Sequence, residues 1–220
     1  MLAKKLKQTK DLMKEVDELQ KKKNEYDDYK QFWKLLKERK DEILDFIEVY
    51  KLLRRLDVNK FNLKDIDELI KTNKKIIFEL ENDSIPDKYD LFTLEDKINN
   101  YKKQLKRLWE EYVNEKTSEI INTLKNIKML FSNPREIKKL IKKTDELKNK
   151  WPLKETDLNK LEEISKEGNK IINSLNVNNE IQNFLNLVSN GDAQISDLSP
   201  QIIEWLENNN FDDKLKITFY

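Results

Sequence analysis

Apolar residues in the first quarter of the chain recur every three or four positions, from about Leu2 to Leu56. This spacing predicts one long α-helix with an apolar stripe, of the kind that packs in bundles and coiled coils. At 1.5 Å per residue such a helix would be roughly 80 Å long, more than the width of a compact domain of this size. We therefore expect part of it to project or to pair. The stripe consists of Leu12, Val16, Leu19, Tyr26, Tyr29, Trp33, Leu36, Ile43, Phe46, Ile47, Tyr50 and Leu53.

Two lysines, Lys23 and Lys30, interrupt this stripe. The first half of the helix therefore predicts a weak seam. The second half is richer in aromatic residues, and we expect it to pack more firmly because large aromatic side chains bury the most apolar area.

Six further helices are expected from the same periodicity and from capping signals. Asn62 is expected to cap a helix that continues to Leu80, and Thr93 to start another that continues to Phe131. The three later starts are predicted at Asn133-Pro134, at a Thr156 cap and at Ser199-Pro200, and a short helix is predicted from Asn179 to Val188, ending before Gly191. The terminal residues, Leu215 to Tyr220, alternate like one short strand.

These elements predict an all-α fold, because the chain has only two glycines and four prolines to make the tight turns that sheets need. We expect an elongated helical bundle with a coiled-coil hairpin over residues 1–131 and a smaller helical region over 132–220. Charge supports a division, since residues 1–60 carry 17 basic and 13 acidic side chains, whereas 176–220 carry 2 and 7.

The composition excludes several common classes of catalytic, metal-binding and nucleotide-binding site. The chain lacks histidine and cysteine, which excludes histidine-based triads, cysteine nucleophiles and ordinary zinc sites. Gly168 and Gly191 are too far apart for phosphate-binding or dinucleotide-binding loops. Adjacent carboxylates such as Glu110 and Glu111 point about 100° apart on a helix and form no acid–base pair. We expect no catalytic residue, no cofactor and no metal, and hence no enzyme.

The chain is rich in charges of both signs. It has 43 basic and 42 acidic residues, so 39% of it is charged while the net charge is only +1. This is typical of long, solvated helices rather than of a disordered tail. No apolar run approaches the roughly 20 residues that span a bilayer, and the N-terminus lacks the apolar core of a secretory signal. We therefore expect a cytoplasmic protein without membrane contact.

Three residues are candidates for binding a protein partner: Phe32, Trp33 and Leu36. Tryptophan is enriched at the centres of protein interfaces, and these residues add apolar area to a helix too long to be wholly covered. The ordinary alternative for the tryptophans is packing in the core.

Two basic clusters are candidates for contact with phosphate groups. Their members are Lys102, Lys103, Lys106 and Arg107 in the first, and Lys138, Lys139, Lys142 and Lys143 in the second. Both could instead be polar helix faces balanced by nearby acids. A near-neutral chain with few arginines favours this second interpretation, because nucleic-acid binders are usually clearly basic and rich in arginine.

The sequence thus favours a scaffold or assembly protein that acts through helix-mediated protein–protein interaction, with another protein or with itself. It could be a helical segment of a larger bacterial or phage machine. The alternative is a nucleic-acid-associated protein that uses its lysine-rich helix faces.

Overall fold

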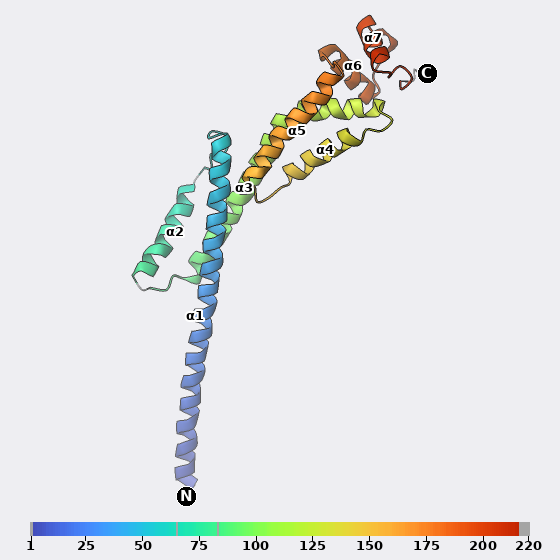
Figure 1. Ribbon diagram of the computed structural model, residues 1–220. Helices are drawn as coiled ribbons and strands as arrows, with labels where there is room; N and C mark the ends of the chain where they lie inside the picture. The colour runs from blue at the N-terminus through green and yellow to red at the C-terminus, as the bar shows by residue number, and fades with distance from the viewer. Residues whose placement is uncertain (1, 65, 83, 216–220) are drawn as a thin grey trace. The chain divides into compact units, whose positions relative to one another are not determined.

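The structure is a computed structural model of the 220-residue chain; it describes residues 2–64, 66–82 and 84–215, with side chains from residue 13 onward. These ranges contain α-helices and two short 3-10 helices but no strand, so the predicted all-α fold is confirmed (Figure 1). The helices are α1 (Leu2–Leu56), α2 (Ile66–Glu81), α3 (Lys88–Ile127), η1 (Lys128–Leu130), α4 (Arg135–Lys148), α5 (Glu155–Ser174), α6 (Asn179–Asn190), η2 (Ile195–Asp197) and α7 (Pro200–Asn208). The strand predicted at the C-terminus lies, apart from Leu215, outside the described residues.

The predicted bounds of the long first helix are confirmed, and the chain forms two compact units. Unit 1 consists of Met1–Lys51 and Asn62–Gln104, and unit 2 of Leu52–Phe61 and Leu105–Tyr220. Both α1 and α3 contribute residues to each unit. The division predicted between residues 131 and 132 rests on charge and composition and stays a prediction.

The core of unit 1 forms where the aromatic half of α1 meets α2 and the beginning of α3. Phe46 is buried and its ring lies 6.3 Å from that of Tyr101 on α3. Arg39, only 6% exposed, forms ion pairs with Glu42 and, at 2.6 Å, with Glu95 of α3. The second half of α1 therefore contributes buried aromatic residues and the guanidinium group of Arg39 to the core of unit 1, as its richness in aromatic residues predicts.

Unit 2 contains two tryptophans whose indole N–H groups donate hydrogen bonds to backbone carbonyls at the C-terminal ends of neighbouring helices. Trp109 on α3 is fully buried and donates a 3.0 Å hydrogen bond to the carbonyl of Leu147 at the end of α4. Trp205 on α7 donates a 2.6 Å hydrogen bond to the carbonyl of Leu175, just after α5. For both residues the core-packing interpretation is correct.

Three helix starts differ from those predicted. Helix α3 begins before Thr93, since Asp87 accepts a 2.9 Å hydrogen bond from the N–H of Tyr89. Helix α5 begins before Thr156, with Lys154 at the cap position. Helix α2 begins only at Ile66, and Leu63 is buried outside it, so the expected cap at Asn62 is wrong.

The end of α6 and the start of α7 lie where the sequence predicts them. Gly191 ends α6 in the left-handed conformation, with φ of 79°, which glycine adopts without strain. The hydroxyl of Ser199 accepts a hydrogen bond from the N–H of Ile202 at 3.3 Å, with Pro200 in the first turn of α7.

The other glycine permits close packing within unit 2. Gly168 on α5 is buried, and a Cβ atom there would lie 2.3 Å from Cγ2 of Ile120 on α3. That separation is well inside van der Waals contact, and the γ-methyl group of a β-branched residue has little freedom to move away.

We therefore predict that Gly168→Ala destabilises the protein, although alanine is the better helix former by about 1 kcal/mol. Overpacking of this kind costs about 1–3 kcal/mol, so the clash should outweigh the gain in helix propensity. Urea unfolding followed by circular dichroism measures the change. Asn169→Ala, at an exposed neighbouring position of the same helix, is the matched control and should be neutral or stabilising. Stabilisation by Gly168→Ala would contradict the close approach.

Candidate interaction surfaces

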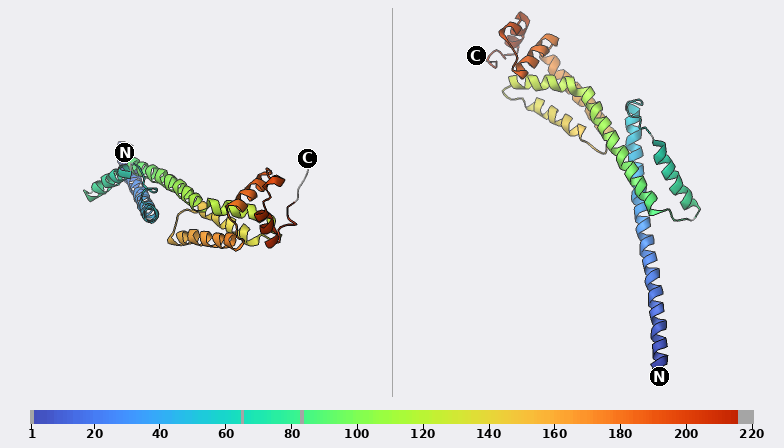
Figure 2. Two further views of the ribbon diagram at one scale, coloured as in Figure 1. Left: turned by 90° about the horizontal axis from the view of Figure 1, so that it is seen from above. Right: turned by 180° about the vertical axis from the view of Figure 1, so that it is seen from behind.

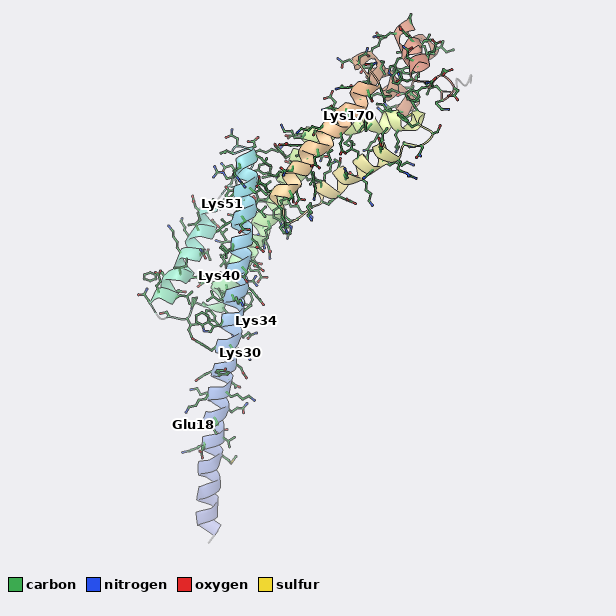
Figure 3. All side chains as sticks on the ribbon, viewed as in Figure 1. Glu18, Lys30, Lys34, Lys40, Lys51 and Lys170 are labelled. Atoms are coloured by element: carbon green, nitrogen blue, oxygen red, sulfur yellow. The ribbon has the colours of Figure 1, made fainter. Side chains whose placement is uncertain are left out.

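The N-terminal half of α1 is uncovered within the described part of unit 1. Every residue from Met13 to Gln31 is exposed, whereas Phe32 is buried. Helix α2 and the beginning of α3 lie beside only the C-terminal half of the unit 1 part of α1 (Figures 1 and 2). Glu18 stands on the uncovered part (Figure 3). At the edge of this part, Asp28 forms a 3.1 Å ion pair with Lys88 at the start of α3.

This uncovered stretch carries the apolar seam that the sequence predicts. Val16, Leu19 and Tyr26 are 61%, 60% and 67% exposed, and their spacing places them in one row along the helix. Lys23 and Lys30 occupy the intervening positions of the same row. We call this row, from Val16 to Trp33, the α1 seam.

The three predicted partner-binding residues differ in exposure. Phe32 is 2% exposed and belongs to the core of unit 1. Its neighbour Trp33 points to another side of the helix, because consecutive helical residues point about 100° apart. Trp33 is 45% exposed and stacks edge-on against Tyr29, with ring centroids 5.8 Å apart. Leu36 is half-buried. Of the predicted residues, Trp33 is exposed on the candidate surface, whereas Phe32 is buried. Val16, Leu19 and Tyr26 also belong to this surface, and all three are part of the apolar stripe that the sequence predicts.

The first lysine cluster lies along α3. Lys102 is half-buried, whereas Lys103, Lys106 and Arg107 are exposed. Arg107 pairs with Glu111, one turn away, at 3.5 Å. Exposed pairs of this type contribute little to stability.

The second lysine cluster lies on α4 in unit 2. Lys142 pairs with Glu146 at 3.6 Å, and Lys143 pairs with Glu167 of α5 at 3.2 Å. Lys138 and Lys139 are exposed, and neither forms an ion pair with a described residue. Half of this cluster is thus balanced by acids, as expected for a polar helix face.

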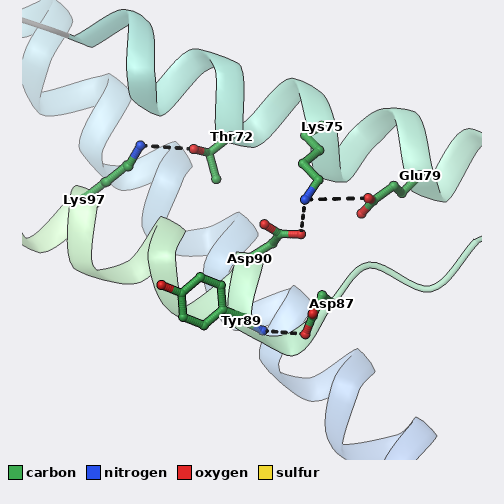
Figure 4. A network of polar contacts seen from close by, with 7 residues as sticks. All are labelled: Thr72, Lys75, Glu79, Asp87, Tyr89, Asp90 and Lys97. Atoms are coloured by element: carbon green, nitrogen blue, oxygen red, sulfur yellow. Dashed lines mark hydrogen bonds and ion pairs between the residues drawn. The ribbon is translucent and has the colours of Figure 1, made fainter.

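A polar network links α2 to α3 within unit 1 (Figure 4). Lys75 on α2 donates a 2.7 Å hydrogen bond to Asp90 on α3, and this bond holds the pKa of Lys75 above its ordinary value. Lys97 on α3 reaches Thr72 at 3.3 Å and also Glu68 at 3.3 Å. The α2 members of these pairs are exposed and the α3 members are half-buried, so the network serves the packing of α2 against α3.

One groove of about 380 Å³ lies between α4 and α5 in unit 2. Its buried acid is Asp157, which is 1% exposed. The carboxylate of Asp157 accepts a 3.0 Å hydrogen bond from the N–H of Lys154 and a 2.9 Å hydrogen bond from the ammonium group of Lys160. The first bond is half of a capping box, so this carboxylate serves the start of α5.

Those contacts determine the protonation of Asp157. Burial acts to raise its pKa, but the hydrogen bonds from Lys160 and Lys154 outweigh burial and hold the pKa below its ordinary value. The group remains a charged hydrogen-bond acceptor near neutral pH, which suits a capping role and not a proton donor.

The rest of the described chain offers neither a cluster of acidic residues able to hold a metal ion nor a helix long and apolar enough to cross a membrane.

Comparison with known proteins adds no constraint: the chain matches no protein-family model, no curated protein and no solved structure. Its surfaces have to be interpreted from their own residues.

We predict that Asp157→Asn destabilises the protein at pH 7 by about 1 kcal/mol, because the amide keeps an acceptor oxygen but loses the charge that strengthens the hydrogen bonds from Lys154 and Lys160. The stability contributed by a carboxylate with a lowered pKa is present above the unfolded pKa, near 3.9, and is lost as pH falls through the folded pKa. The difference between wild type and variant should therefore shrink as pH falls below about 4. Urea unfolding from pH 7 to pH 3 measures it. Glu163→Gln, an exposed change in the same groove, should show no such convergence.

Proposed function

We propose that this chain is a cytoplasmic scaffold or assembly protein, without catalytic activity, that binds protein through the α1 seam. The observation that carries the proposal is the run of exposed residues from Met13 to Gln31 with its row of apolar side chains.

Two physical arguments support a partner at this place. Apolar surface left in water costs about 25 cal/mol per Å², and the exposed seam residues include two aromatic rings, those of Tyr26 and Trp33. Helices are stabilised mainly by packing of an apolar face, and an uncovered helix is marginal in water. A second helix laid along the seam would remove both disadvantages.

The remaining polar features favour a structural role over catalysis. Asp157 caps α5, Arg39 joins α1 to α3 and Lys75 joins α2 to α3. Each of these ionisable groups has a partner that accounts for its position.

Nucleic-acid binding is the second candidate, and it is favoured by the exposed ammonium groups of Lys138 and Lys139, which pair with no acid among the described residues. Such contacts would be strongly salt-dependent because binding releases counterions from phosphate. The pairing of Lys142 and Lys143 with acids and the near-neutral net charge of +1 weigh against it.

We predict no binding of duplex or single-stranded DNA, measured by fluorescence anisotropy at low salt. Binding that weakens as salt is raised and that is lost in Lys138→Gln/Lys139→Gln would support the second candidate instead. Lys21→Gln/Lys22→Gln, at exposed positions elsewhere on the chain, is the matched loss of two charges.

We predict that a photo-crosslinking amino acid at Leu19 captures a protein, either this chain or another, when the protein is present in a lysate of its own cells. The same group at Lys21 should capture none, because Lys21 is equally exposed but lies on the opposite side of the helix. Equal capture at both positions, or capture at neither, would contradict a protein-binding seam.

A further inference from the structure

A second exposed apolar surface of unit 1 lies at the corner where the chain turns from α2 into α3. Three aromatic side chains of this stretch are largely exposed: Phe78 at 65%, Tyr89 at 74% and Phe92 at 49%. Ile85, in the loop between the two helices, is also exposed. We call Phe78, Tyr89 and Phe92 the α2–α3 aromatic face.

Helical geometry directs Phe78 and Tyr89 to the same side of the α2–α3 pair. Phe78 follows the buried Leu69 by nine residues, so it points to the opposite side of α2. Tyr89 precedes the buried Ile98 by nine residues, so it also points away from the core. Because α2 and α3 lie side by side over one core, both rings leave that core in the same direction. Phe92 follows Tyr89 by about one turn.

The contact between the two helices also brings these rings to similar heights. Lys75 of α2 meets Asp90 of α3, with Tyr89 beside this contact (Figure 4). The helices are antiparallel, so Phe78 stands about level with Asp87, three residues before Asp90 (Figure 1). Tyr89 is two residues from Asp87, and the two rings therefore differ in height by only about 3 Å.

The aromatic face has the size of a surface that binds a short segment. With roughly 200 Å² for each aromatic side chain, the three exposed fractions amount to about 400 Å². The largest apolar patches on monomeric proteins cover about 300–600 Å² and are often functional. A stable interface between folded proteins buries about 800 Å² on each partner, so this face suits a peptide-sized contact better.

The charges around the aromatic face indicate the chemistry of its partner. From Ile77 to Phe92 the sequence contains five acidic residues and one lysine, in a chain whose net charge is only +1. Two of these acids pair with Lys75, and the one lysine pairs with Asp28 of α1. The internal pairs therefore leave an excess of negative charge at the corner.

This excess is concentrated at the end of the face nearest the loop. Glu81 and Asp87 are exposed there, and neither forms an ion pair with a described residue. The exposed cations on the outer side of α2 are Lys74 and Lys71, which stand one and two turns before Phe78. A ligand that reaches from the rings toward the loop thus meets acids and no free cation of the described chain.

We propose that the α2–α3 aromatic face binds a segment of another protein that combines apolar and basic side chains. The apolar side chains cover the rings, and a basic side chain lies over Tyr89 or pairs with Glu81 or Asp87. An acidic segment is disfavoured because like charges would meet. This surface is separate from the α1 seam, so the inference does not depend on the function proposed for the seam.

Because the chain contains no cysteine, one introduced cysteine places a polarity-sensitive dye at a chosen position. Ser84→Cys places the dye in the exposed loop of the corner, and Ser118→Cys places it at an exposed position of α3 in unit 2. The probes are two synthetic amphipathic peptides of equal length, one of leucine and lysine and one of leucine and glutamate. The leucine–lysine peptide should change the emission of the dye at Ser84 and not at Ser118, and the leucine–glutamate peptide should change neither.

Variants separate the apolar part of the interaction from the charged part. Phe78→Ser/Tyr89→Ser should weaken binding of the leucine–lysine peptide at least tenfold, and circular dichroism should show a preserved fold because both rings point away from the core. Glu81→Lys should weaken binding several-fold, and so should added salt. Glu119→Lys, at an exposed position in unit 2, is the matched change of charge and should bind the peptide like the parent protein.

A response at Ser84 to the leucine–lysine peptide alone, lost in the double variant and weakened by Glu81→Lys, supports the inference. A response to both peptides or to neither overturns it, and so does a response that these variants leave unchanged. If unlabelled protein alone changes the emission at Ser84, a second copy covers the face and the inference is also wrong. Crosslinking at Leu19 tests the α1 seam independently of all these outcomes.

Discussion

The structure depends on how the apolar stripe of one long helix is covered. From Phe32 onward the stripe of α1 is buried within unit 1, with Phe46 beside Tyr101 and Arg39 bound to Glu95. Before Phe32 the same helix continues with every described side chain exposed, back to Met13. Both halves are helical, and they differ in that Lys23 and Lys30 interrupt the apolar stripe of the first half and that neighbouring helices cover the second.

Much of this could be predicted because the strongest signals are local. Periodicity alone located α1, and Gly191 and Ser199 marked the end of α6 and the start of α7 because each satisfies a backbone need on its own. The starts of α3 and α5 were misplaced because several acids and hydroxyl groups compete to cap a helix. Asp87 accepts a hydrogen bond from the N–H of Tyr89 in the first turn of α3, and Asp157 accepts one from the N–H of Lys154, just before α5, through geometry that spacing does not reveal.

The candidate surface was less accessible from sequence for a different reason. Phe32, Trp33 and Leu36 look equivalent as a cluster of apolar residues, but the position of the neighbouring helices decides which side of α1 is covered. That is a tertiary fact, and it buries Phe32 while leaving Trp33 45% exposed. The lysine clusters show the same limit, since the pairing of Lys143 with Glu167 joins residues from separate helices.

The boundary at Phe32 also separates two kinds of tolerance to substitution. Substitutions between Met13 and Gln31 alter a surface that contributes no side chain to the buried core, so they can change the α1 seam without disturbing the packing of the fold. Substitutions after Phe32 are constrained by packing first. The chemical character of one stretch of helix can therefore be altered while the folded body that carries it remains the same.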